Sequence, residues 1–300
     1  MNRGTGKDNG ELPLGIVTVT YSPGRHLPAL VESLPDNVVL ILADNGSVDG
    51  VPEEVAASDD RVILVPTGGN IGYGGAANRG IAELARMGER GEVRDDYVLL
   101  VNPDVTFDPG AIEALLDCAG RTPRAGSVGP RIEEPDGSTY PSARAVPELV
   151  SGTGHALLAD IWPKNPFSRR YRDDSDMDRE RDAGWLSGSC LLLDRQAFDS
   201  VGGFDSRYFM YMEDVDLGDR LGRAGWRNVY CPTSVIRHDQ GHSAKQYRKR
   251  TLMAHHESAY RFMSDRLPGP GRAPVRWALK AGLWLRVRLI LAIGTLRSTR

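Results

Sequence analysis

Short β-rich runs alternate with helical stretches through the first half of this chain, and this alternation limits its fold more than any other feature. Strands are expected at residues 15–21, 38–44, 61–65, 97–102 and 127–132. Helices are expected between them, at residues 27–34, 52–57, 74–90 and 109–118. Strands and helices that alternate in this way form a mostly parallel sheet covered by helices on both faces. The sequence therefore predicts an α/β fold.

Polar, turn-forming residues follow the first four of these expected strands. In an open parallel sheet, ligands bind beyond the carboxyl ends of the strands, so these residues are the first candidates for a binding site. The four strand ends read Thr20-Tyr21, Asp44-Asn45-Gly46-Ser47, Thr67-Gly68-Gly69-Asn70 and Asn102-Pro103-Asp104. A site is therefore expected at this edge of the sheet.

The second half is less regular and ends in helices. Solvated loops are expected at residues 133–153 and 168–182, and the second carries eleven charges in fifteen residues. The expected strands are 185–194, 226–230 and 235–238, and the expected helices are 215–224, 244–264 and 273–296. We therefore divide the chain into a disordered leader (1–13), an α/β domain (14–243) and a basic helical region (244–300).

Charge is unevenly distributed along the 300 residues. The chain has 37 Lys and Arg against 40 Asp and Glu, a formal net charge of −3, so it lacks the positive field typical of nucleic-acid-binding proteins. Residues 272–300 carry seven of the cations and no acidic residue, which gives this tail +7 and the preceding chain −10. Four cations interrupt the most apolar stretch, residues 275–296, so no membrane-spanning helix is expected.

The three cysteines, Cys118, Cys190 and Cys231, lie in apolar stretches and have no metal-like spacing. We expect buried thiols in a reducing cytosol. The first thirteen residues lack the apolar core of a signal peptide, so the sequence does not indicate export.

Two acidic motifs and one histidine are candidates for chemistry. Asn102-Pro103-Asp104 places two oxygen-bearing side chains on one side of an extended segment, an arrangement that suits Mg²⁺ held against a substrate diphosphate. The alternative is a turn that caps the next helix. Glu213-Asp214 lies at an expected helix N-terminus beside an aromatic run, which favours either helix capping or a general base. His238 ends the last expected strand and is either structural or a metal ligand with Asp104.

A glycine-rich segment after the third expected strand has two interpretations. Gly72-x-Gly74-x-x-Ala77 formally matches the dinucleotide-binding fingerprint, with an acidic residue about 20 positions later. The fingerprint usually occupies the first strand-to-helix turn, however, and here it follows the third. A turn that lets the backbone approach any diphosphate fits equally well.

The order of these motifs, from about Leu14 to Ser243, resembles glycosyltransferase family 2, whose members have the GT-A fold. Val17-Thr18-Val19-Thr20-Tyr21 is similar to the family's opening strand, Asp44-Asn45-Gly46-Ser47-x-Asp49-Gly50 to its nucleotide turn, and Asn70-x-Gly72-Tyr73-x-x-Ala76-x-Asn78 to the following segment. Asn102-Pro103-Asp104 stands at the position of the Asp-x-Asp metal motif, with Asn in place of one Asp. Gly188-Ser189 is similar to an acceptor-side turn and Glu213-Asp214 to the motif that holds the catalytic base.

The resemblance implies an inverting, metal-dependent sugar transferase with a Rossmann-like GT-A fold and a C-terminal helical extension. It implies that the nucleotide-sugar is bound by Thr20, Tyr21, Asp44, Asn45, Gly72, Asn78 and Asn102. Mg²⁺ or Mn²⁺ would be held by Asp104 with Asn102 and His238. Asp214, with Glu213 beside it, would act as the base, and Trp185, Gly188 and Ser189 would contact the acceptor.

Within the family, the Asn-Pro-Asp variant, the run from Gly202 to Leu217 and the basic C-terminal helices are similar to actinobacterial rhamnosyltransferases. This similarity implies transfer of L-rhamnose from dTDP-rhamnose to a GlcNAc-diphospho-decaprenol lipid during cell wall arabinogalactan synthesis. The alternative within the family is another hexosyl or galactofuranosyl transferase. The alternatives outside it are an NAD(P)-dependent oxidoreductase and a carbohydrate-binding scaffold.

The basic tail also has two interpretations. It is either a packing or homo-oligomerisation helix, or an interfacial segment with Trp277 and Trp284 at the acyl boundary and its cations on anionic head groups. The lipid acceptor implied by the resemblance favours the second. That interpretation places the protein peripherally on the cytoplasmic face of the membrane.

Overall fold

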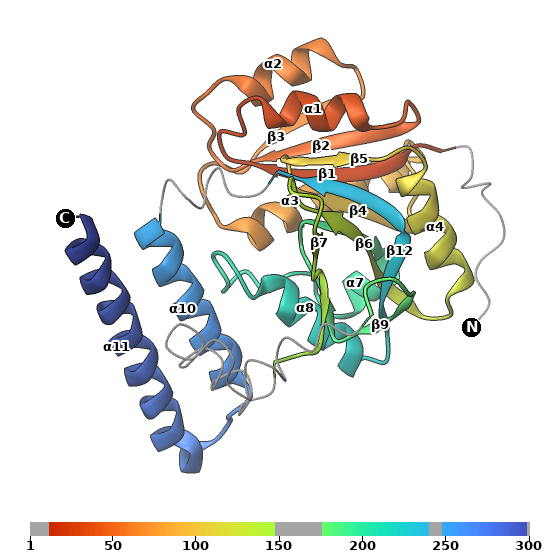
Figure 1. Ribbon diagram of the computed structural model, residues 1–300. Coiled ribbons are helices and arrows are strands. Elements are labelled where there is room, and N and C mark those ends of the chain that lie inside the picture. The colour runs from red at the N-terminus through yellow and green to blue at the C-terminus, as the bar shows by residue number, and fades with distance from the viewer. Residues whose placement is uncertain (1–11, 148–175, 240–247, 299–300) are drawn as a thin grey trace.

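The strand-like runs of the first half pair into one sheet in the computed structural model, which describes residues 12–147, 176–239 and 248–298 (Figure 1). The parallel strands are β1 (Leu14–Thr20), β2 (Val38–Asp44), β3 (Val62–Pro66) and β4 (Tyr97–Val101). β1 is buried along its whole length because β2 and β4 flank it in parallel. The expected α/β class is confirmed.

The rest of the sheet has mixed pairing. Its strands are β5 (Val105–Phe107), β6 (Ala125–Glu133), β11 (Cys190–Asp194) and β12 (Arg227–His238), and the strand order is β3-β2-β1-β4-β11-β6-β12-β5. β11 runs antiparallel to both β4 and β6, whereas β12 is parallel to β6. Short strands β7 (Thr139–Tyr140) and β9 (Arg181–Ala183) pair with β6 and β12. β8 (Ala143–Arg144) and β10 (Trp185–Leu186) form a separate ribbon.

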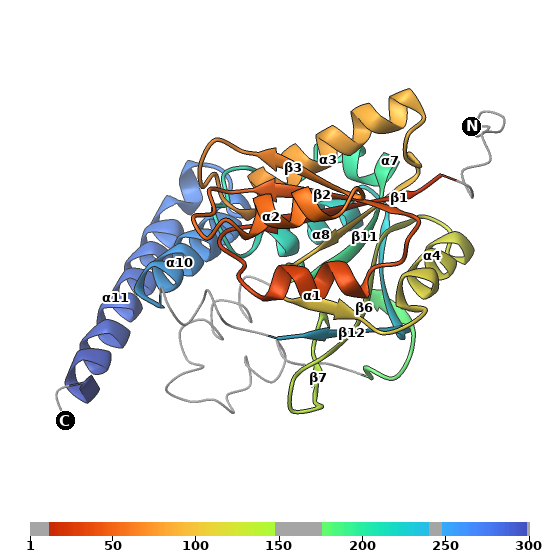
Figure 2. The same ribbon diagram turned by 90° about the horizontal axis from the view of Figure 1, so that it is seen from above.

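Helices cover both faces of the sheet (Figure 2). One face packs against α1 (His26–Ser33), α2 (Val51–Ser58) and α4 (Ala111–Arg121), which share a core with the strands through Leu30, Val55 and Leu115. The other face packs against α3 (Tyr73–Arg90), α7 (Arg195–Ser200) and α8 (Glu213–Arg223) through Ile81, Phe198 and Leu217. The molecule therefore has three layers, with the sheet between two layers of helices. The carboxyl ends of β1, β2 and β4 lie at one edge of the sheet.

The structure corrects three local predictions. The expected strand at 185–194 is two strands in different sheets, β10 and β11, separated by the turn Ser187-Gly188-Ser189. The two strands expected at 226–230 and 235–238 are one strand, β12, whose register to β6 shifts between Cys231 and Val235. Pro232 lies in that shift and has no N–H to donate, which is why the sequence pattern breaks there. Four short strands, β5, β7, β8 and β9, were not expected.

The C-terminal helices α10 (Arg248–Asp265) and α11 (Ala273–Ser298) lie side by side and pack against the α8 side of the molecule (Figure 1). Phe262, Leu279 and Leu283 share a buried cluster with Trp185 and Val215. The Ser258 hydroxyl donates a 2.8 Å hydrogen bond to the carbonyl of Met210. Arg266 pairs with Asp219, and Arg207 lies 2.8 Å from Asp265. The helical region and α8 therefore form one packed unit.

Other expectations concern the chain as a whole. Cys118, Cys190 and Cys231 are all buried free thiols, as expected. Within the residues described, no helix combines the length and the apolar character needed to span a membrane. The expected leader falls almost entirely on residues 1–11, and the expected boundary at 243/244 falls within 240–247; both stretches lie outside the described residues.

Candidate active site

The end of β2 presents an acidic side chain surrounded by donors. The Asp44 carboxylate accepts a 2.8 Å hydrogen bond from the Thr20 hydroxyl, and it also accepts from the Ser47 hydroxyl and from the backbone N–H groups of Gly46 and Ser47. Asp44 is 8% exposed and Thr20 is fully buried, whereas Tyr21 is exposed. The buried Thr20 hydroxyl thus orients the Asp44 carboxylate. Of Thr20, Tyr21 and Asp44, Tyr21 is the residue that is exposed to solvent.

Asn45 fixes the glycine-rich loop against β2. Its amide nitrogen donates to the Asn70 side-chain oxygen at 3.1 Å and to the Gly72 carbonyl at 3.3 Å. Its amide oxygen accepts from the backbone N–H of Ile71 at 2.9 Å and from the Thr67 hydroxyl at 3.1 Å. Asn45 is buried, and these contacts hold the glycine-rich loop in its conformation. The predicted contact of Asn45 with the nucleotide stays a prediction.

Gly72 and Asn78 both join α3 to the segment before α8. Gly72 has φ +86°, and a Cβ built there would lie 2.5 Å from the Phe209 carbonyl oxygen, which also accepts from the N–H of Tyr73 at 3.0 Å. The Asn78 amide exchanges two hydrogen bonds with the backbone of Phe204, at 2.8 and 2.9 Å. Close approach of the protein backbone therefore explains the glycine at 72, and the dinucleotide interpretation is not needed.

The acid pair lies at the start of α8, as the sequence suggested. The carboxylate of Asp214 accepts from the N–H of Gly188 at 3.0 Å and from the N–H of Val215 at 2.8 Å. The Tyr73 hydroxyl donates to the Gly188 carbonyl at 2.8 Å, so the peptide units at Gly188 connect α3 to Asp214. Glu213 is 7% exposed, and one of its carboxylate oxygens is buried without a hydrogen-bond partner in the part of the chain that the structure describes.

Burial dominates the electrostatics of this pair. Desolvation, followed by the negative charge of Asp214, raises the pKa of Glu213 to about 8. Desolvation also raises the pKa of Asp214, although the hydrogen bonds from Gly188 and Val215 oppose this shift. Burial likewise raises the pKa of Tyr73 well above its ordinary value, so its phenol remains a donor. Burial therefore disfavours two negative charges on this pair near neutrality.

The backbone before α8 is strained. Tyr211 and Met212 both have φ +67°, a left-handed conformation that costs side-chain-bearing residues free energy. Met212 is the N-cap of α8, so this turn sets the direction in which Glu213 and Asp214 leave the aromatic run. The sequence held no signal for it, because Gly and Asn are the residues that usually indicate this conformation.

The ends of β4 and β12 bring a carboxylate and an imidazole together. β12 pairs antiparallel with β5 so that His238 lies opposite Val105, and His238 Nε2 is 3.1 Å from an oxygen of Asp104. The ring is buried, and its Nδ1 has no hydrogen-bond partner within residues 12–147, 176–239 and 248–298. The N–H of Asn102 donates to the carbonyl of Ser189 at 2.9 Å. A carboxylate and an imidazole at this spacing fit a divalent cation, and Asn102 links them to the turn at Gly188-Ser189.

The predicted acceptor residues differ in their surroundings. Gly188 contacts Asp214 directly, and the Ser189 hydroxyl lies 3.1 Å from the Ser187 hydroxyl. Trp185 is buried in the cluster with α10 and α11, and its indole N–H donates to the Ala145 carbonyl at 3.1 Å. Its ring therefore belongs to the core that supports α8.

Sequence reasoning missed Arg144. This residue lies on β8, and its guanidinium carbon is 5.9 Å from the centre of the Trp185 ring and 5.6 Å from that of Tyr140. Its positive charge lowers the pKa of Asp214, against the stronger effect of burial. An isolated arginine in a segment rich in Pro, Gly and Ser gave no motif by which to find it.

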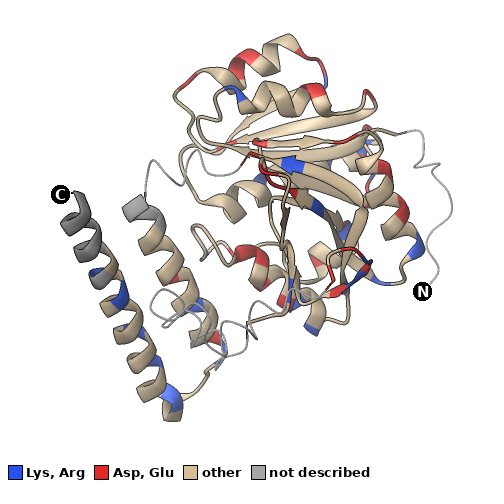
Figure 3. Ribbon diagram, in the orientation of Figure 1, with Lys and Arg blue, Asp and Glu red and all other residues tan. Residues whose placement is uncertain are grey.

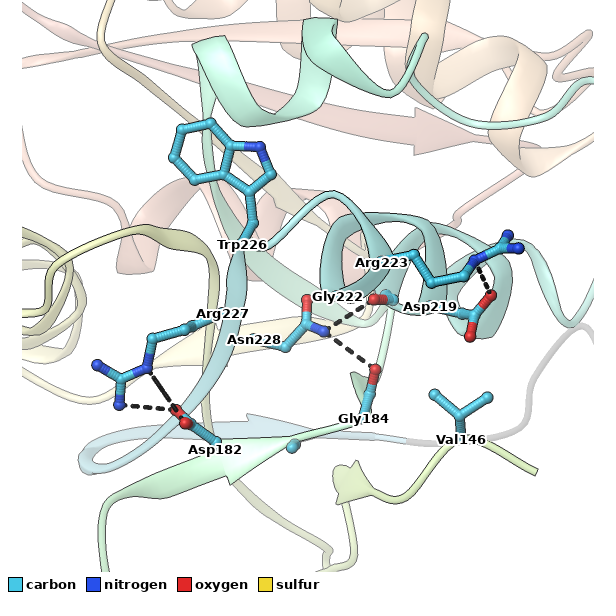
Figure 4. Close-up of a pocket in the computed structure, with 11 residues that line it drawn as sticks. Val146, Asp182, Gly184, Asp219, Gly222, Arg223, Trp226, Arg227 and Asn228 are labelled. Carbon is cyan, nitrogen blue, oxygen red and sulfur yellow. Dashed lines mark hydrogen bonds and ion pairs between the residues drawn. The ribbon is translucent and has the colours of Figure 1, made fainter. Parts of the chain in front are cut away.

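A separate surface pocket of about 280 Å³ lies at the far end of α8 (Figure 4). Ion pairs on its walls join Arg227 to Asp182 at 2.8 Å and Arg223 to Asp219 at 3.0 Å. The Asn228 amide points between the carbonyls of Gly184 and Gly218, at 3.0 and 2.9 Å. Its described lining includes none of the predicted site residues.

Comparison with known proteins identifies the family of this chain. Residues 24–252 match the family described as glycosyltransferase-like family 2. The chain belongs to this family. It is a glycosyltransferase, and the oxidoreductase alternative is therefore discarded.

The chain is 52% identical over 293 residues to the N-acetylglucosaminyl-diphospho-decaprenol L-rhamnosyltransferase of Mycobacterium tuberculosis, a match that covers 96% of this chain and 95% of that protein. A rhamnosyltransferase of Escherichia coli is 27% identical over 253 residues, covering 83% of this chain and 92% of the relative.

Solved structures confirm the GT-A-like fold of this glycosyltransferase. A mannosyltransferase from Pyrobaculum calidifontis, solved with GDP-Man and Mn²⁺, superposes with a TM-score of 0.55 at 13% identity, over 98% of this chain and 82% of that one. GalNAc-T7, solved with UDP, GalNAc and Mn²⁺, gives a TM-score of 0.56 at 14% identity, over 92% of this chain and 55% of the other. At such identities the likeness concerns the fold alone.

Proposed function

We propose that this chain transfers L-rhamnose from dTDP-rhamnose to a GlcNAc-diphospho-polyprenol lipid, with inversion at the anomeric carbon, in cell wall synthesis. The observation that carries the proposal is the 52% identity to the mycobacterial rhamnosyltransferase, because it extends over 96% of this chain and 95% of the relative. A match over nearly all of both chains includes the acceptor side and the C-terminal helices. The name of that relative gives the transferred sugar and the lipid acceptor.

The donor would bind at the carboxyl ends of β1, β2 and β4. Asp44 would accept a hydrogen bond from the pyrimidine N3–H, and the exposed Tyr21 would cover the base. Asp104 and His238, 3.1 Å apart, would hold Mg²⁺ or Mn²⁺ together with oxygens of the diphosphate, and Asn102 would lie beside them. When bound, such a cation neutralises the charge that develops on the leaving diphosphate.

The acceptor would enter on the side of Gly188 and α8. Asp214 would take the proton of the attacking hydroxyl, and its raised pKa makes it a stronger base than an exposed aspartate. The N–H of Gly188 holds one oxygen of this carboxylate, which leaves the group oriented toward the turn where the acceptor is expected. Glu213, kept neutral near pH 7 by burial, avoids a second charge beside the base.

The membrane surface is the proposed partner of the C-terminal helices. Leu279 and Leu283 of α11 are buried, while Trp277 and Trp284 are 73% and 58% exposed on its other side. Cations and no acidic residues occur along the coloured part of α11 (Figure 3). A helix with outward aromatic rings and positive charges fits an anionic bilayer surface, where a polyprenyl acceptor resides. We place the enzyme peripherally on the cytoplasmic face.

A donor comparison tests the proposed reaction. The purified full chain is incubated with Mg²⁺ or Mn²⁺, a synthetic GlcNAc-diphospho-lipid and either dTDP-rhamnose, UDP-galactofuranose or UDP-glucose, and the lipid products are analysed by mass spectrometry. We expect a rhamnosylated lipid with dTDP-rhamnose. Product formed with a UDP-sugar alone would replace this proposal with the other hexosyl or galactofuranosyl activity. Binding of donor or acceptor without product under every condition would favour a carbohydrate-binding scaffold.

A further inference from the structure

Two buried thiols and one carboxylate, far apart in sequence, meet on the sheet face that α4 covers. Cys118 lies in the last turn of α4, Cys231 lies within β12, and Glu180 directly precedes β9. One potential ligand atom from each of them lies within 4.8 Å of the other two. Both cysteines are buried and free, whereas Glu180 is exposed. None of these residues takes part in the proposed transfer reaction.

The fold fixes the three positions independently. α4 packs against β6 and β12, which holds Cys118 above the strand that carries Cys231. β9 pairs antiparallel with β12, with Arg181 opposite Tyr230, and this pairing brings Glu180 beside Cys231. Cys231 also lies where the β12 register shifts, and its sulfur is 3.3 Å from the Thr233 hydroxyl. The cluster is therefore built by a helix, a central strand and an edge strand together.

We propose that Cys118, Cys231 and Glu180 bind one Zn²⁺ ion. Two thiolates and a carboxylate are typical zinc ligands, and tetrahedral bonds to two sulfurs at about 2.3 Å place those sulfurs roughly 3.8 Å apart, within the spacing seen here. Water would supply the fourth ligand from the exposed side, where Glu180 meets solvent. Binding displaces the two thiol protons, and the ion joins the two sulfurs and the carboxylate.

The arrangement around Glu180 supports this assignment. Arg121, one helical turn after Cys118, forms an ion pair with Glu180. A carboxylate has two oxygens, so one can remain paired with Arg121 while the other faces the thiols. A hydrogen-bonded partner of this kind orients a ligating carboxylate. Arg121 also offsets part of the charge of two thiolates and one carboxylate around a divalent ion.

The proposed zinc site differs in chemistry from the cation site at Asp104 and His238. Cys231 and His238 lie on the same strand, seven residues apart and on opposite sides of its register shift. Thiolate ligands select zinc over Mg²⁺ and Mn²⁺, which prefer oxygen. A zinc ion bound by the three residues would cross-link α4, β9 and β12. The chain continues from β9 into the segment that contains Gly188. Its role would be to stabilise the fold.

Cobalt binding provides a test with a readout separate from catalysis. The reduced, metal-free full chain is titrated with Co²⁺, and thiolate-to-cobalt charge transfer is followed in the near-ultraviolet. We expect one equivalent to develop this band and Zn²⁺, but not Mg²⁺, to abolish it. Cys118→Ser and Cys231→Ser should lose the band, and Glu180→Gln should weaken binding. Cys190→Ala is the matched control, since Cys190 is buried in β11 outside the cluster and its variant should keep the band.

A second measurement keeps the test independent of how well each variant folds. Native mass spectrometry of the wild-type chain with Zn²⁺ should show one tightly bound zinc with two protons displaced. The proposal is overturned if the folded wild-type chain gives neither the cobalt band nor this adduct. It is also overturned if the band persists in the double variant of Cys118 and Cys231, or if thiol counting finds these two cysteines joined in a disulfide in the protein as isolated.

Discussion

Asp214 is a carboxylate that is desolvated, oriented by two backbone N–H groups and adjacent to a neutral acid. If it is the base, Asp214→Asn keeps the size of the side chain but removes the proton acceptor, and its one oxygen can accept from only one of the two N–H groups. We expect turnover to fall by at least about 10²-fold while the affinity for dTDP-rhamnose stays near that of the wild type. Initial rates and calorimetric titration of the donor measure the two effects separately.

The matched control for that substitution is Asp199→Asn. Asp199 is a solvent-exposed aspartate on α7, paired with Arg195 at 3.3 Å, and its variant should retain full turnover. A turnover of Asp214→Asn close to that of the control would remove Asp214 from the role of base.

Glu213 makes stability depend on pH in a predictable direction. Its folded-state pKa, raised to about 8, exceeds the unfolded value near 4.5, so the folded state holds a proton that the unfolded state has lost between these limits. The contribution of this proton to the free energy of unfolding is fully present below about pH 4.5. It declines as pH rises to about 8, by up to about 1.4 kcal/mol per pH unit. As pH rises from about 4.5 to 8, the free energy of unfolding of Glu213→Gln should therefore fall less than that of the wild type.

Urea unfolding at pH 5, 6, 7 and 8 measures this difference. Asp214 contributes a slope of the same sign and is present in both proteins, so it does not account for the difference between them. Parallel stability curves for the wild type and Glu213→Gln would show that Glu213 is ionised in the folded protein near neutrality.

Asp104 and His238 are expected to make donor binding depend on a divalent cation. Asp104→Ala removes the only charged member of the proposed ligand set and should abolish the gain in nucleotide affinity that Mn²⁺ gives. Asp108→Asn is a suitable control, because Asp108 lies nearby in sequence but pairs with Arg237. Titration of dTDP with and without Mn²⁺ measures the effect. An unchanged Mn²⁺ dependence in Asp104→Ala would show that this residue is not a ligand.

At the scale of elements, the contact between α3 and the segment before α8 is sensitive to one methyl group. Gly72 and Gly50 are both N-caps with positive φ, but a Cβ at Gly72 would meet the Phe209 backbone, whereas one at Gly50 would meet nothing within 4 Å. Gly50→Ala should cost about 1–2 kcal/mol from backbone strain alone.

Gly72→Ala should cost more than Gly50→Ala and should also lower turnover, since Phe209 cannot move without disturbing the turn that positions Glu213. Thermal unfolding and initial rates test the pair. Equal losses of stability, with turnover unchanged in both variants, would contradict this account of Gly72.

The sequence predicted the elements whose pattern is local. β2 has the expected bounds, and β1, β3, β4 and helices α1 to α4 differ from expectation by a few residues, because alternating apolar runs and glycine turns define them. The misplaced elements depend on distant partners. β5 exists because β12 pairs with it, and β10 separates from β11 because β8 pairs with Trp185 and Leu186. Residue periodicity carries no information about such partners.

The candidate site shows the same limit. Motif order placed Asp44, Asp104 and Glu213-Asp214 at the ends of elements, and the pairing of Asp104 with His238 was already suggested by the residues themselves. The internal hydrogen bonds of Asn45 and Asn78 could not be predicted, since an asparagine that binds a ligand and one that binds its own backbone have the same sequence. The meeting of Cys118 with Cys231, 113 positions apart, depends on how α4 packs onto β12.

At the scale of the whole molecule, α11 presents its apolar aromatic side to solvent. Replacing Trp277 and Trp284 together by Ser should weaken binding to anionic vesicles by at least about tenfold, because burying one large apolar side chain contributes about 1.5–3 kcal/mol. Co-sedimentation with phosphatidylglycerol vesicles measures this loss. Met253→Ser is the control, since Met253 is 53% exposed on α10 and not part of that side of α11.

Charge reversal separates the two forces in this interaction. Lys280→Glu with Arg288→Glu should reduce binding to anionic vesicles, by roughly 1 kcal/mol for each cation lost, and leave the weaker binding to neutral vesicles unchanged. If the wild type does not co-sediment with either vesicle and instead forms a dimer that the Trp variants disrupt, the exposed side of α11 is an interface between two copies of the chain.

The packing of α10 and α11 onto α8 has a practical consequence for engineering. Arg266 pairs with Asp219, Ser258 contacts Met210, and Phe262 shares a cluster with Trp185, so the hairpin of α10 and α11 is attached to α8, to the segment before it and to β10. In a chimaera in which only residues 185–223 are replaced by those of another transferase, α10 and α11 would keep side chains that do not fit the new segment. If residues 185–223 bind the acceptor as proposed, acceptor specificity should be transferred by exchanging this segment together with the hairpin.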